Sequence, residues 1–390
     1  MPIVIQSSSE NVTAQGPILV ANDPNDSPGA SVSARTYTIG ASGDFTTWSD
    51  AASAWNAGTL TDAIAGDDII LEEIDGAAYD EFVAFTALPV AYASLTLTVE
   101  PSVRHNGTAG SGARITPTGT NVSGGVIYFA DTLAATDITV EWLEIDASGS
   151  ASTAHGVFFR PSNASSISIV RNNIIHGVTS TAGDNGGIML RVAQYKIHNN
   201  LVYDIKNTST AASTVHVRGI YAGNSTFGTV LIENNTVYGI VKTGGSANCL
   251  GIHYIDNASH TVKNNAVANC ASGTTSGTEA CYSPGTSSLA TANNNASDDT
   301  TAPGTDVPIT SAAWNDADND DFQPASGSAL YQAGADLGTT NGVNVDVTGR
   351  DRDAQNDTWS IGAWQVAVGA GGPTNSVAPR GFSLGLGLSL

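Results

Sequence analysis

Short apolar segments recur at intervals of about 30 residues through the middle of this chain. One kind of segment contains an Asn-Asn pair, as in "IVRNNIIHGV", "KIHNNLVYDI", "LIENNTVYGI" and "TVKNNAVANC". A second kind begins with a glycine, at Gly125, Gly156, Gly187, Gly219 and Gly251. Neither shows the 3.6-residue period of a helix, so both indicate strands. Strands that stack on their own next copy predict a parallel β-solenoid, with about 4.8 Å between coils.

The Asn pairs are expected to mark one corner of this solenoid. Their first members are Asn172, Asn199, Asn234 and Asn264, with a looser copy at Asn294. Every coil must turn at the same place, and Asn tolerates the left-handed backbone conformation that a tight corner requires. Stacked Asn side chains can also hydrogen-bond from coil to coil. Because equivalent copies argue against a catalytic role for any one of them, we interpret the first four as a structural Asn ladder.

The segments that flank the repeat resemble the ends of known β-helices. "DFTTWSDAASAWNAG" places Phe45, Trp48 and Trp55 at helical spacing, which predicts a capping helix near residues 44–57. The order that follows, a Gly-Asp, an apolar strand and Gly-x-x-Tyr-x-Glu, resembles the start of right-handed parallel β-helices of the pectin-lyase-like superfamily. "DFQPASGSALYQAGADLG" and "VDVTGRDRDAQNDTWSIGAWQ" are similar to the closing segment of bacterial members, so the resemblance covers roughly residues 37–366.

This resemblance implies an all-β fold, a right-handed single-stranded parallel β-helix with an N-terminal capping helix and extended terminal arms. It implies no single function, because the superfamily holds lyases, hydrolases, esterases, adhesins and phage tailspikes. The expected organisation is an N-terminal arm (1–36), the β-helix (37–300), a C-terminal closing segment (301–366) and a Gly/Pro linker with an apolar docking tail (367–390).

The charge of the chain excludes several classes of partner. Its 14 basic and 36 acidic residues give a formal net charge of −22, which repels phosphate backbones, so nucleic acid is not an expected partner. A membrane is not expected either, because no apolar run reaches the roughly 18 residues of a span. The first residues lack a signal peptide's basic and apolar regions. We therefore expect synthesis in a host cytoplasm and a final place in a virion, with an extracellular location as the alternative.

One outward column of residues could carry catalytic chemistry. The residue before each Asn pair should point away from the core, and this column reads Glu141, Arg171, His198, Glu233 and Lys263. Glu141 and Glu233 would be three coils, or about 14 Å, apart, which is too far for a glycosidase pair. His198 and Glu233 are weak candidates for an acid–base pair, but a solvated ladder of ion pairs is the favoured interpretation. No coherent catalytic set emerges, so an enzyme is not the favoured class.

The sequence also gives little evidence for cofactors or disulfides. "NDADNDDF" places Asp316, Asp318 and Asp320 at alternating positions, which makes them weak candidates for Ca²⁺ ligands. The glycine and the distal glutamate of an EF-hand are missing, so no cofactor is expected. The three cysteines give no disulfide framework, and we interpret Cys270 and Cys281 as buried core residues.

A second outward column is apolar and aromatic. If the Val or Ile after each repeat glycine points inward, the next residue faces out, which gives Ile127, Phe158, Met189, Tyr221, His253 and Tyr282. Monomers seldom expose such a patch, and interfaces favour these residue types, so we expect an interface with other subunits. The alternatives are a covering loop of the same chain and an aromatic track that binds sugars.

The end of the chain predicts a second interface. Large apolar residues alternate with Gly and Ser, at Phe382, Leu384, Leu386, Leu388 and Leu390. A free strand of this kind invites edge pairing, so we expect it to dock on a virion partner or on another copy of the chain, giving a homo-oligomer.

These observations favour a structural virion protein of a bacteriophage, of the head decoration, fibre or spike type, that works through assembly and through attachment to a surface or a glycan. The alternative is an extracellular β-helix that degrades or binds a polysaccharide. A bacterial surface adhesin is a third class.

Overall fold

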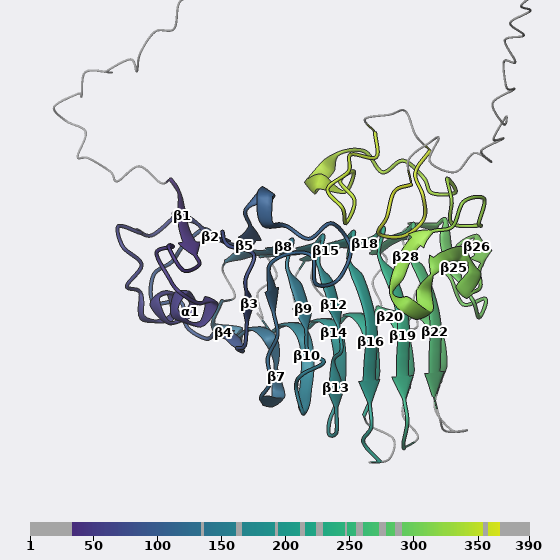
Figure 1. Ribbon diagram of the computed structural model, residues 1–390, viewed down its shortest axis with the longest axis horizontal. Helices are drawn as coiled ribbons and strands as arrows, with labels where there is room; N and C mark the ends of the chain where they lie inside the picture. Colours follow the sequence, from purple (N-terminus) through teal and green to yellow (C-terminus); the bar gives the residue numbers. More distant parts are fainter. Residues whose placement is uncertain are drawn as a thin grey trace, which may run out of the picture.

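The computed structural model describes residues 33–133, 136–160, 166–191, 194–210, 215–223, 229–245, 248–254, 260–272, 278–284, 291–353 and 358–366. They form an all-parallel β-solenoid of about eight turns, with successive turns about 30 residues apart. This architecture confirms the all-β β-helix that the repeat predicts. Figure 1 shows the strands stacked side by side along the long axis of the molecule.

A complete coil contributes one strand to each of three parallel sheets, in the order A, B, C. Sheet A runs through β1 (Ala34–Ile39), β2 (Asp68–Glu73), β5 (Ser94–Val99), β8 (Asp137–Glu141), β11 (Ile167–Arg171), β15 (Gln194–His198), β18 (Val230–Glu233), β21 (His260–Lys263) and β24 (Thr291–Asn293). Sheet B runs through β3 (Ala78–Tyr79), β6 (Arg114–Ile115), β9 (Glu144–Asp146), β12 (Ile174–His176), β16 (Leu201–Asn207), β19 (Thr236–Lys242), β22 (Ala266–Ser272), β25 (Asn295–Ser297) and β26 (Asp306–Pro308), with β13 (Thr179–Ser180) beside β16. Sheet C runs through β4 (Val83–Phe85), β7 (Thr120–Phe129), β10 (Ser152–Phe159), β14 (Asn185–Leu190), β17 (Val217–Ala222), β20 (Cys249–Tyr254) and β23 (Glu279–Pro284).

The two residues of each Asn pair have different tasks at the corner between sheets A and B. The first Asn adopts the left-handed conformation that the sequence predicts, with φ between 54° and 57° at Asn172, Asn199, Asn234 and Asn264. The coil-to-coil amide ladder, however, is built by the second Asn of each pair, which corrects the expectation. Its side-chain amides link Asn173, Asn200, Asn235, Asn265 and Asn295 with N···O distances of 2.9 to 3.0 Å.

The repeat glycines are explained by the closeness of sheets B and C. A Cβ placed on Gly219 would lie 2.4 Å from Cγ1 of Val237 in sheet B, and one on Gly187 would lie 2.4 Å from Cγ1 of Val202. No side chain fits in that space, because real Cβ atoms do not approach other atoms so closely. The glycine column therefore lets branched residues of sheet B fill the core.

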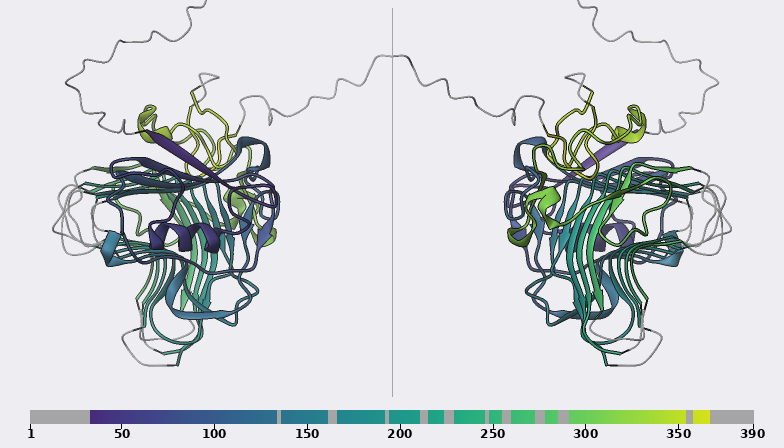
Figure 2. Two further views of the ribbon diagram at one scale, coloured as in Figure 1. Left: turned by 90° about the vertical axis from the view of Figure 1, so that its left-hand side faces the viewer. Right: turned by 90° about the vertical axis from the view of Figure 1, so that its right-hand side faces the viewer.

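Helix α1 (Trp48–Ala57) covers the N-terminal end of the solenoid, as the sequence predicts. Thr47 caps its first turn by accepting a hydrogen bond from the Asp50 amide, and Gly58 ends it with φ 67°. Trp48 and Trp55 are fully buried, and the Trp55 ring lies 4.8 Å from that of Tyr92. Figure 2 shows α1 lying across the end of the coils. Most of the expected N-terminal arm lies outside the described residues, but β1 already begins at Ala34.

The C-terminal segment, residues 330–366, lies along the side of the solenoid (Figure 1). The first Asn of each pair holds it: Asn172 donates to the carbonyl of Val345 (2.8 Å) and Asn199 to the carbonyl of Val343 (3.0 Å). The buried Arg352 donates to the side-chain oxygen of Asn199 (3.1 Å) and to two carbonyls of the segment itself. A second apolar core lies on the outer face of sheet B, where this segment and residues 309–322 pack against it. The first Asn of each pair thus anchors the C-terminal segment to the corner through hydrogen bonds.

The remaining elements are short. They are the 3₁₀ turns η1 (Pro101–Val103), η2 (Asp131–Leu133), η3 (Ser311–Ala313), η4 (Ala317–Asn319) and η5 (Thr340–Gly342), and the antiparallel hairpin of β27 (Trp314–Asp316) and β28 (Asp321–Pro324).

Candidate functional site

Sheet B contains a second column of left-handed residues, and this column shapes the candidate site. Gly177, Asp204, Gly239 and Asn269 have φ of 70°, 53°, 68° and 58° in successive coils. These residue types are the ones that tolerate this conformation. Each bends its strand at the same height, so the residue before it takes the same outward place in every coil.

The residues before the bends form an outward aromatic column of His176, Tyr203 and Tyr238. The strand register pairs His176 with Tyr203 and Tyr203 with Tyr238. The rings of His176 and Tyr203 are stacked, with centroids 4.8 Å apart and planes 2° apart. These two rings cover each other's faces, and Tyr203 is only 3% exposed, whereas Tyr238 is half-buried.

Two carboxylates fix the orientation of the His176 ring. Its Nε2 lies 3.1 Å from Oε1 of the buried Glu144, and its Nδ1 lies 3.7 Å from Oδ1 of Asp146. The other Glu144 oxygen accepts a hydrogen bond of 2.6 Å from the Gly110 amide. The imidazole is thereby held parallel to Tyr203 and is not free to rotate.

The hairpin of β27 and β28 forms a wall beside this column. The Phe322 ring lies 5.0 Å from Tyr203 and 5.4 Å from Tyr238, and the Trp314 ring lies 5.6 Å from Tyr238. Phe322 and Trp314 are buried by these contacts. The hairpin turn between them brings Asp318 and Asp320 next to the aromatic column.

The aromatic column and the hairpin enclose a groove of about 460 Å³. Its lining residues are Ser148, His176, Tyr203, Asp204, Lys206, Tyr238, Gly239, Val241, Asn269, Ala317, Asp318 and Asp320. A second hollow of about 330 Å³, which reaches Asp298 and Ile309, shares Tyr238 and Asn269 with the first. The first hollow alone is lined from five successive coils, Ser148 to Asn269, and so follows the solenoid axis over a span of about 19 Å.

Carboxylates dominate the charge of the groove. Lys206 is the one Lys or Arg among the described lining residues, and it is paired with Asp204 at 2.5 Å. Asp318 accepts a hydrogen bond of 3.3 Å from the Tyr238 hydroxyl. Burial raises the pKa of Asp320, and the nearby Asp204 carboxylate raises it further while His176 opposes the shift. The groove therefore combines aromatic side chains with an excess of carboxylates over Lys and Arg.

Asp316, Asp318 and Asp320, the weak candidates for Ca²⁺ ligands, are not among the described groups that bring three possible ligand atoms together. Asp318 and Asp320 face the groove, whereas Asp316 lies outside its lining and accepts a hydrogen bond from Asn319 (2.8 Å). The described groups that do bring three possible ligand atoms together are Glu144 with Asp146 and His176, and Cys281 with Asp298 and Asp299. Both are engaged internally, since Glu144 orients His176 and the Cys281 thiol donates to Asp298 at 2.9 Å.

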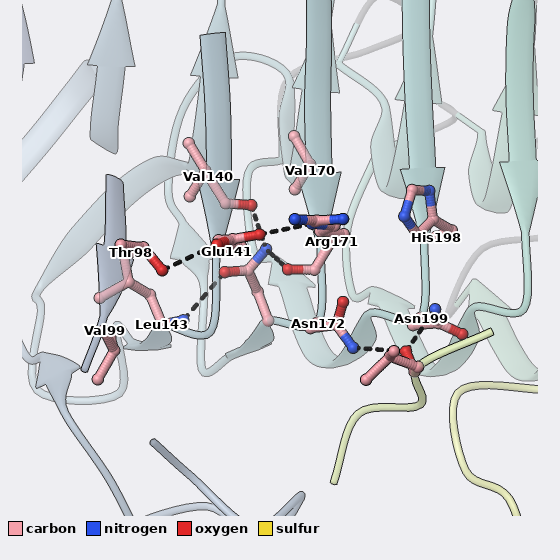
Figure 3. A network of polar contacts seen from close by, with 12 residues as sticks. Thr98, Val99, Val140, Glu141, Leu143, Val170, Arg171, Asn172, His198 and Asn199 are labelled. Carbon is pink, nitrogen blue, oxygen red and sulfur yellow. Dashed lines mark hydrogen bonds and ion pairs between the residues drawn. The ribbon is translucent and has the colours of Figure 1, made fainter. Parts of the chain in front are cut away.

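The column Glu141, Arg171, His198, Glu233 and Lys263 has the predicted register, but it is not a solvated ladder. Glu141, His198 and Glu233 are at most 9% exposed. The C-terminal segment lies over the column, as Gly342 packs against the Arg171 guanidinium. Glu141 is held by Arg171 at 2.5 Å and by Thr98 at 2.9 Å (Figure 3).

This cover leaves His198 and Glu233 no approach for a polymeric substrate. Burial raises the pKa of Glu233, and the attraction of Lys263 opposes that shift. Figure 3 shows Asn172 and Asn199 pointing from the same corner toward the C-terminal segment. The two weak catalytic candidates are thus neighbours in register but lie beneath the docked segment.

The apolar column on sheet C differs from its prediction in register and in exposure. Val157 pairs with Ile127 and Ile252 pairs with Tyr282, so Ile127 and Tyr282 point into the core and are fully buried. The bulge in the pairing of β7 with β10 and the absence of a glycine in β23 each place the strand one residue away from the alignment that the sequence suggests. A shift of one residue reverses the direction of a side chain. The outward partners are Tyr128 and Ser283 instead.

The rest of that column is not an open apolar stripe. Phe158 and Met189 are buried, and Tyr221 and His253 are half-buried. Guanidinium groups lie over the rings, with Arg191 at 5.3 Å from Phe158 and Arg218 at 4.6 Å from Tyr221. Arg218 also donates to His253 Nδ1 at 2.9 Å, so this face is capped by its own cationic side chains.

The other sequence predictions have mixed outcomes. Cys281 is buried, as expected, and takes the register position of Gly251, whereas Cys270 is half-buried and differs from the expectation of a buried core residue. The predicted docking tail with Phe382, Leu384, Leu386, Leu388 and Leu390 lies outside the described residues.

The aromatic groove was not found from the sequence, although a signal for it exists. The stretches "IIHGV", "LVYDI", "TVYGI" and "AVANC" place Gly, Asp, Gly and Asn at one repeat position, directly after His, Tyr, Tyr and Ala. A recurring Gly/Asp/Asn inside a strand indicates a bend, so the residue before it is expected to take the same outward place in every coil.

No protein-family model matches this chain, and no curated protein sequence is similar enough to serve as a relative. No helix in the described ranges has the length and apolar character that crossing a bilayer requires.

Proposed function

We propose that this protein is a carbohydrate-binding β-helix that holds an extended sugar chain in the groove of sheet B. The observation that carries the proposal is the elongated groove of sheet B, which His176, Tyr203 and Tyr238 line in successive coils. The exposed part of the half-buried Tyr238 ring can pack against the apolar face of a sugar ring.

The polar groups of the groove complement these rings. Asp204 and Lys206 at one side and Asp318 and Asp320 at the other offer hydrogen-bond acceptors and a donor for sugar hydroxyls. The span of about 19 Å over five coils accommodates several sugar units in a row, because the spacing between coils is close to the length of one sugar unit. Binding sites of this type fix a ligand with a few polar groups placed around an apolar platform.

Binding is a better proposal than cleavage for this groove. The His176 imidazole is held between Glu144 and Asp146, and the one lining lysine is paired with Asp204. These groups are thus already paired with a neighbouring charge, whereas the hairpin carboxylates Asp318 and Asp320 are exposed. The alternative, a polysaccharide-degrading enzyme, would have to use Asp318 and Asp320, which makes it testable at the same two positions.

The proposal fits the wider expectations from the sequence. We infer that the chain is a member of the pectin-lyase-like superfamily and acts as an attachment component of a phage virion, of the fibre or spike type. A groove that binds a surface glycan supports attachment, whereas the cationic cover of sheet C weakens the argument for an assembly interface there. Identification of capsid and tail genes beside the gene for this protein would test the virion assignment.

Isothermal titration calorimetry with a panel of neutral, acidic and amino-sugar oligosaccharides tests the binding proposal. We expect at least one member to bind, and Tyr238→Ala to weaken that binding by about tenfold or more, because a stacking face is lost. Tyr128→Ala is the matched control, since Tyr128 is a half-buried tyrosine on sheet C. Equal binding by both variants and the parent protein would reject the groove as the site.

An assay for new reducing ends separates binding from cleavage. We expect no new ends from any glycan that binds. Turnover that disappears in Asp318→Asn or Asp320→Asn would establish the enzymatic alternative.

A further inference from the structure

Two of the three cysteines lie side by side at the C-terminal end of the solenoid. Cys270 belongs to β22 in sheet B, where it pairs in register with Ile240, and Cys281 belongs to β23 in sheet C. A Cβ placed on Gly251 would lie 3.0 Å from the Cys270 sulfur, so this sulfur is directed at the glycine column. Cys281 takes the next place in that column, because it lies opposite Gly251 in register. The contact between its thiol and that of Cys270, together with burial, raises the pKa of Cys281.

The last coil of sheet C has room for a side chain at the glycine position. One coil earlier, a Cβ on Gly251 would lie 2.3 Å from Cγ1 of Val267, in the next strand of sheet B. For Cys281 that next strand is β25, in which the smaller Ser297 takes the register position of Val267. The cysteine therefore replaces the glycine in a coil that can hold its sulfur beside Cys270.

We propose that Cys270 and Cys281 are a dithiol pair that an oxidant converts into a disulfide between β22 and β23. The half-buried Cys270 reacts first. Its thiolate attacks a low-molecular-weight disulfide of the glutathione class, releases one thiol and keeps the other half as a mixed disulfide. The buried Cys281 then displaces that half. One S–S bond forms in the protein and one breaks in the oxidant, which takes up two electrons and two protons.

The contacts of the pair favour a disulfide over a metal site. The Cys281 thiol donates to Asp298 at 2.9 Å and forms one group of possible ligands with Asp298 and Asp299, but Cys270 is not part of that group. A soft metal is typically held by several thiolate or imidazole ligands, and this group offers a single thiolate. Oxidation removes the proton that Asp298 accepts, but this carboxylate is exposed to water and also accepts from the Asn269 amide at 2.8 Å.

Equilibration of the protein in mixtures of reduced and oxidised glutathione tests the proposal. After each equilibration the sample is quenched with acid, unfolded in an alkylating reagent, digested and mapped by mass spectrometry. We expect Cys270 and Cys281 to lose their free thiols together, in one two-electron transition, and to appear as one pair of linked peptides. Cys249 should stay a free thiol at every ratio, because it is buried and its thiol donates to the Ile240 carbonyl at 2.8 Å.

Two variants take their new residues from the repeat itself and should therefore keep the fold. Cys281→Gly restores the glycine of the earlier coils, and Cys270→Ile restores the residue of the register neighbour Ile240. In Cys281→Gly we expect Cys270 to accumulate as a mixed disulfide with glutathione, because the second thiol is absent. In Cys270→Ile we expect Cys281 to stay free. Cys249→Ala is the matched control and should leave the transition unchanged, and circular dichroism checks the fold of all three variants.

Two results would overturn the proposal. One is a folded parent protein in which Cys270 and Cys281 do not link at any ratio of oxidised to reduced glutathione. The other is a bridge from Cys270 to Cys249, which would place the reactive pair elsewhere in the core. Neither result concerns the groove of sheet B, so the proposed function is tested separately.

Discussion

The side-chain amide of Asn173 donates to the side-chain oxygen of Asn200 at 3.0 Å, across two coils of the solenoid. The same amide nitrogen also donates to the carbonyl of Val140 at 2.9 Å, so a single side chain ties together three coils. The Asn before it, Asn172, turns the backbone and points the other way, toward the C-terminal segment. One dipeptide therefore joins the coils internally and docks the segment externally.

Replacing the ladder member Asn235 should cost more stability than replacing its neighbour Asn234. The Asn235 side chain donates to Asn265 (2.9 Å) and accepts from the Asn200 side chain (3.0 Å), and both partners are buried. Asn235→Leu leaves these groups unsatisfied, so we expect a loss of about 3 kcal/mol or more in the free energy of unfolding. Asn234→Gly keeps the left-handed conformation and should cost about 1 kcal/mol. Denaturant titration measures both, and equal costs would contradict the division of tasks.

Gly219→Ala should destabilise the β-helix by about 2–4 kcal/mol. The added Cβ would lie 2.4 Å from Val237 and 2.7 Å from the Gly251 carbonyl oxygen, and neither the core nor the backbone can easily move. The double variant Gly219→Ala, Val237→Ala should recover part of this loss relative to the sum of the single changes, since it removes the closer clash. Thermal unfolding followed by circular dichroism provides the comparison, and strict additivity would count against the proposed contact.

The stability of the N-terminal coil should fall as the pH rises from about 4.5 to about 7. Burial, together with the neighbouring Asp75 carboxylate, raises the pKa of Glu73 from 4.5 to about 7. A carboxyl whose pKa is raised by folding stabilises the folded state below its unfolded pKa, and that contribution is lost as pH passes through the folded value. Glu73→Gln cannot titrate, so the difference in stability between the parent protein and this variant should change across that window. A difference that is constant from pH 4 to 8 would show that Glu73 is not the titrating group.

Arg352→Met should release the C-terminal segment from the Asn corner. Arg352 is fully buried and donates to Gly362, Ala363 and Asn199, so its loss leaves carbonyl groups without donors. Limited proteolysis should then cut within residues 330–366 faster than in the parent protein, while the coils keep their circular dichroism. Arg191→Met, which removes an exposed arginine on sheet C, should not change the cleavage rate.

The repeat phase of the sequence was enough to predict the parallel coils and the left-handed corner at Asn172 and its equivalents, and the helical spacing of Trp48 and Trp55 predicted the capping helix. The coils could be predicted because each one repeats the same local preferences: Asn for the left-handed turn, Gly for close packing, and apolar alternation for the core. The prediction failed where a coil departs from the repeat. At β7 and β23 a shift of one residue placed Ile127 and Tyr282 inside, because a strand's side chains alternate and a single step reverses them.

Only the tertiary structure decides whether a residue at an outward position is exposed or covered by another segment. His198 and Glu233 are polar and outward in the pattern, yet they are buried because residues 330–366, which do not repeat, fold back over them. Tyr203 and Tyr238 become the floor of a groove only because the β27–β28 hairpin, more than 70 residues further along the chain, packs Phe322 and Trp314 beside them. A periodic pattern specifies the conformation of each coil, but it contains no information on where a non-repeating segment finds its complementary surface, since that contact depends on the shape and polarity of the assembled coils.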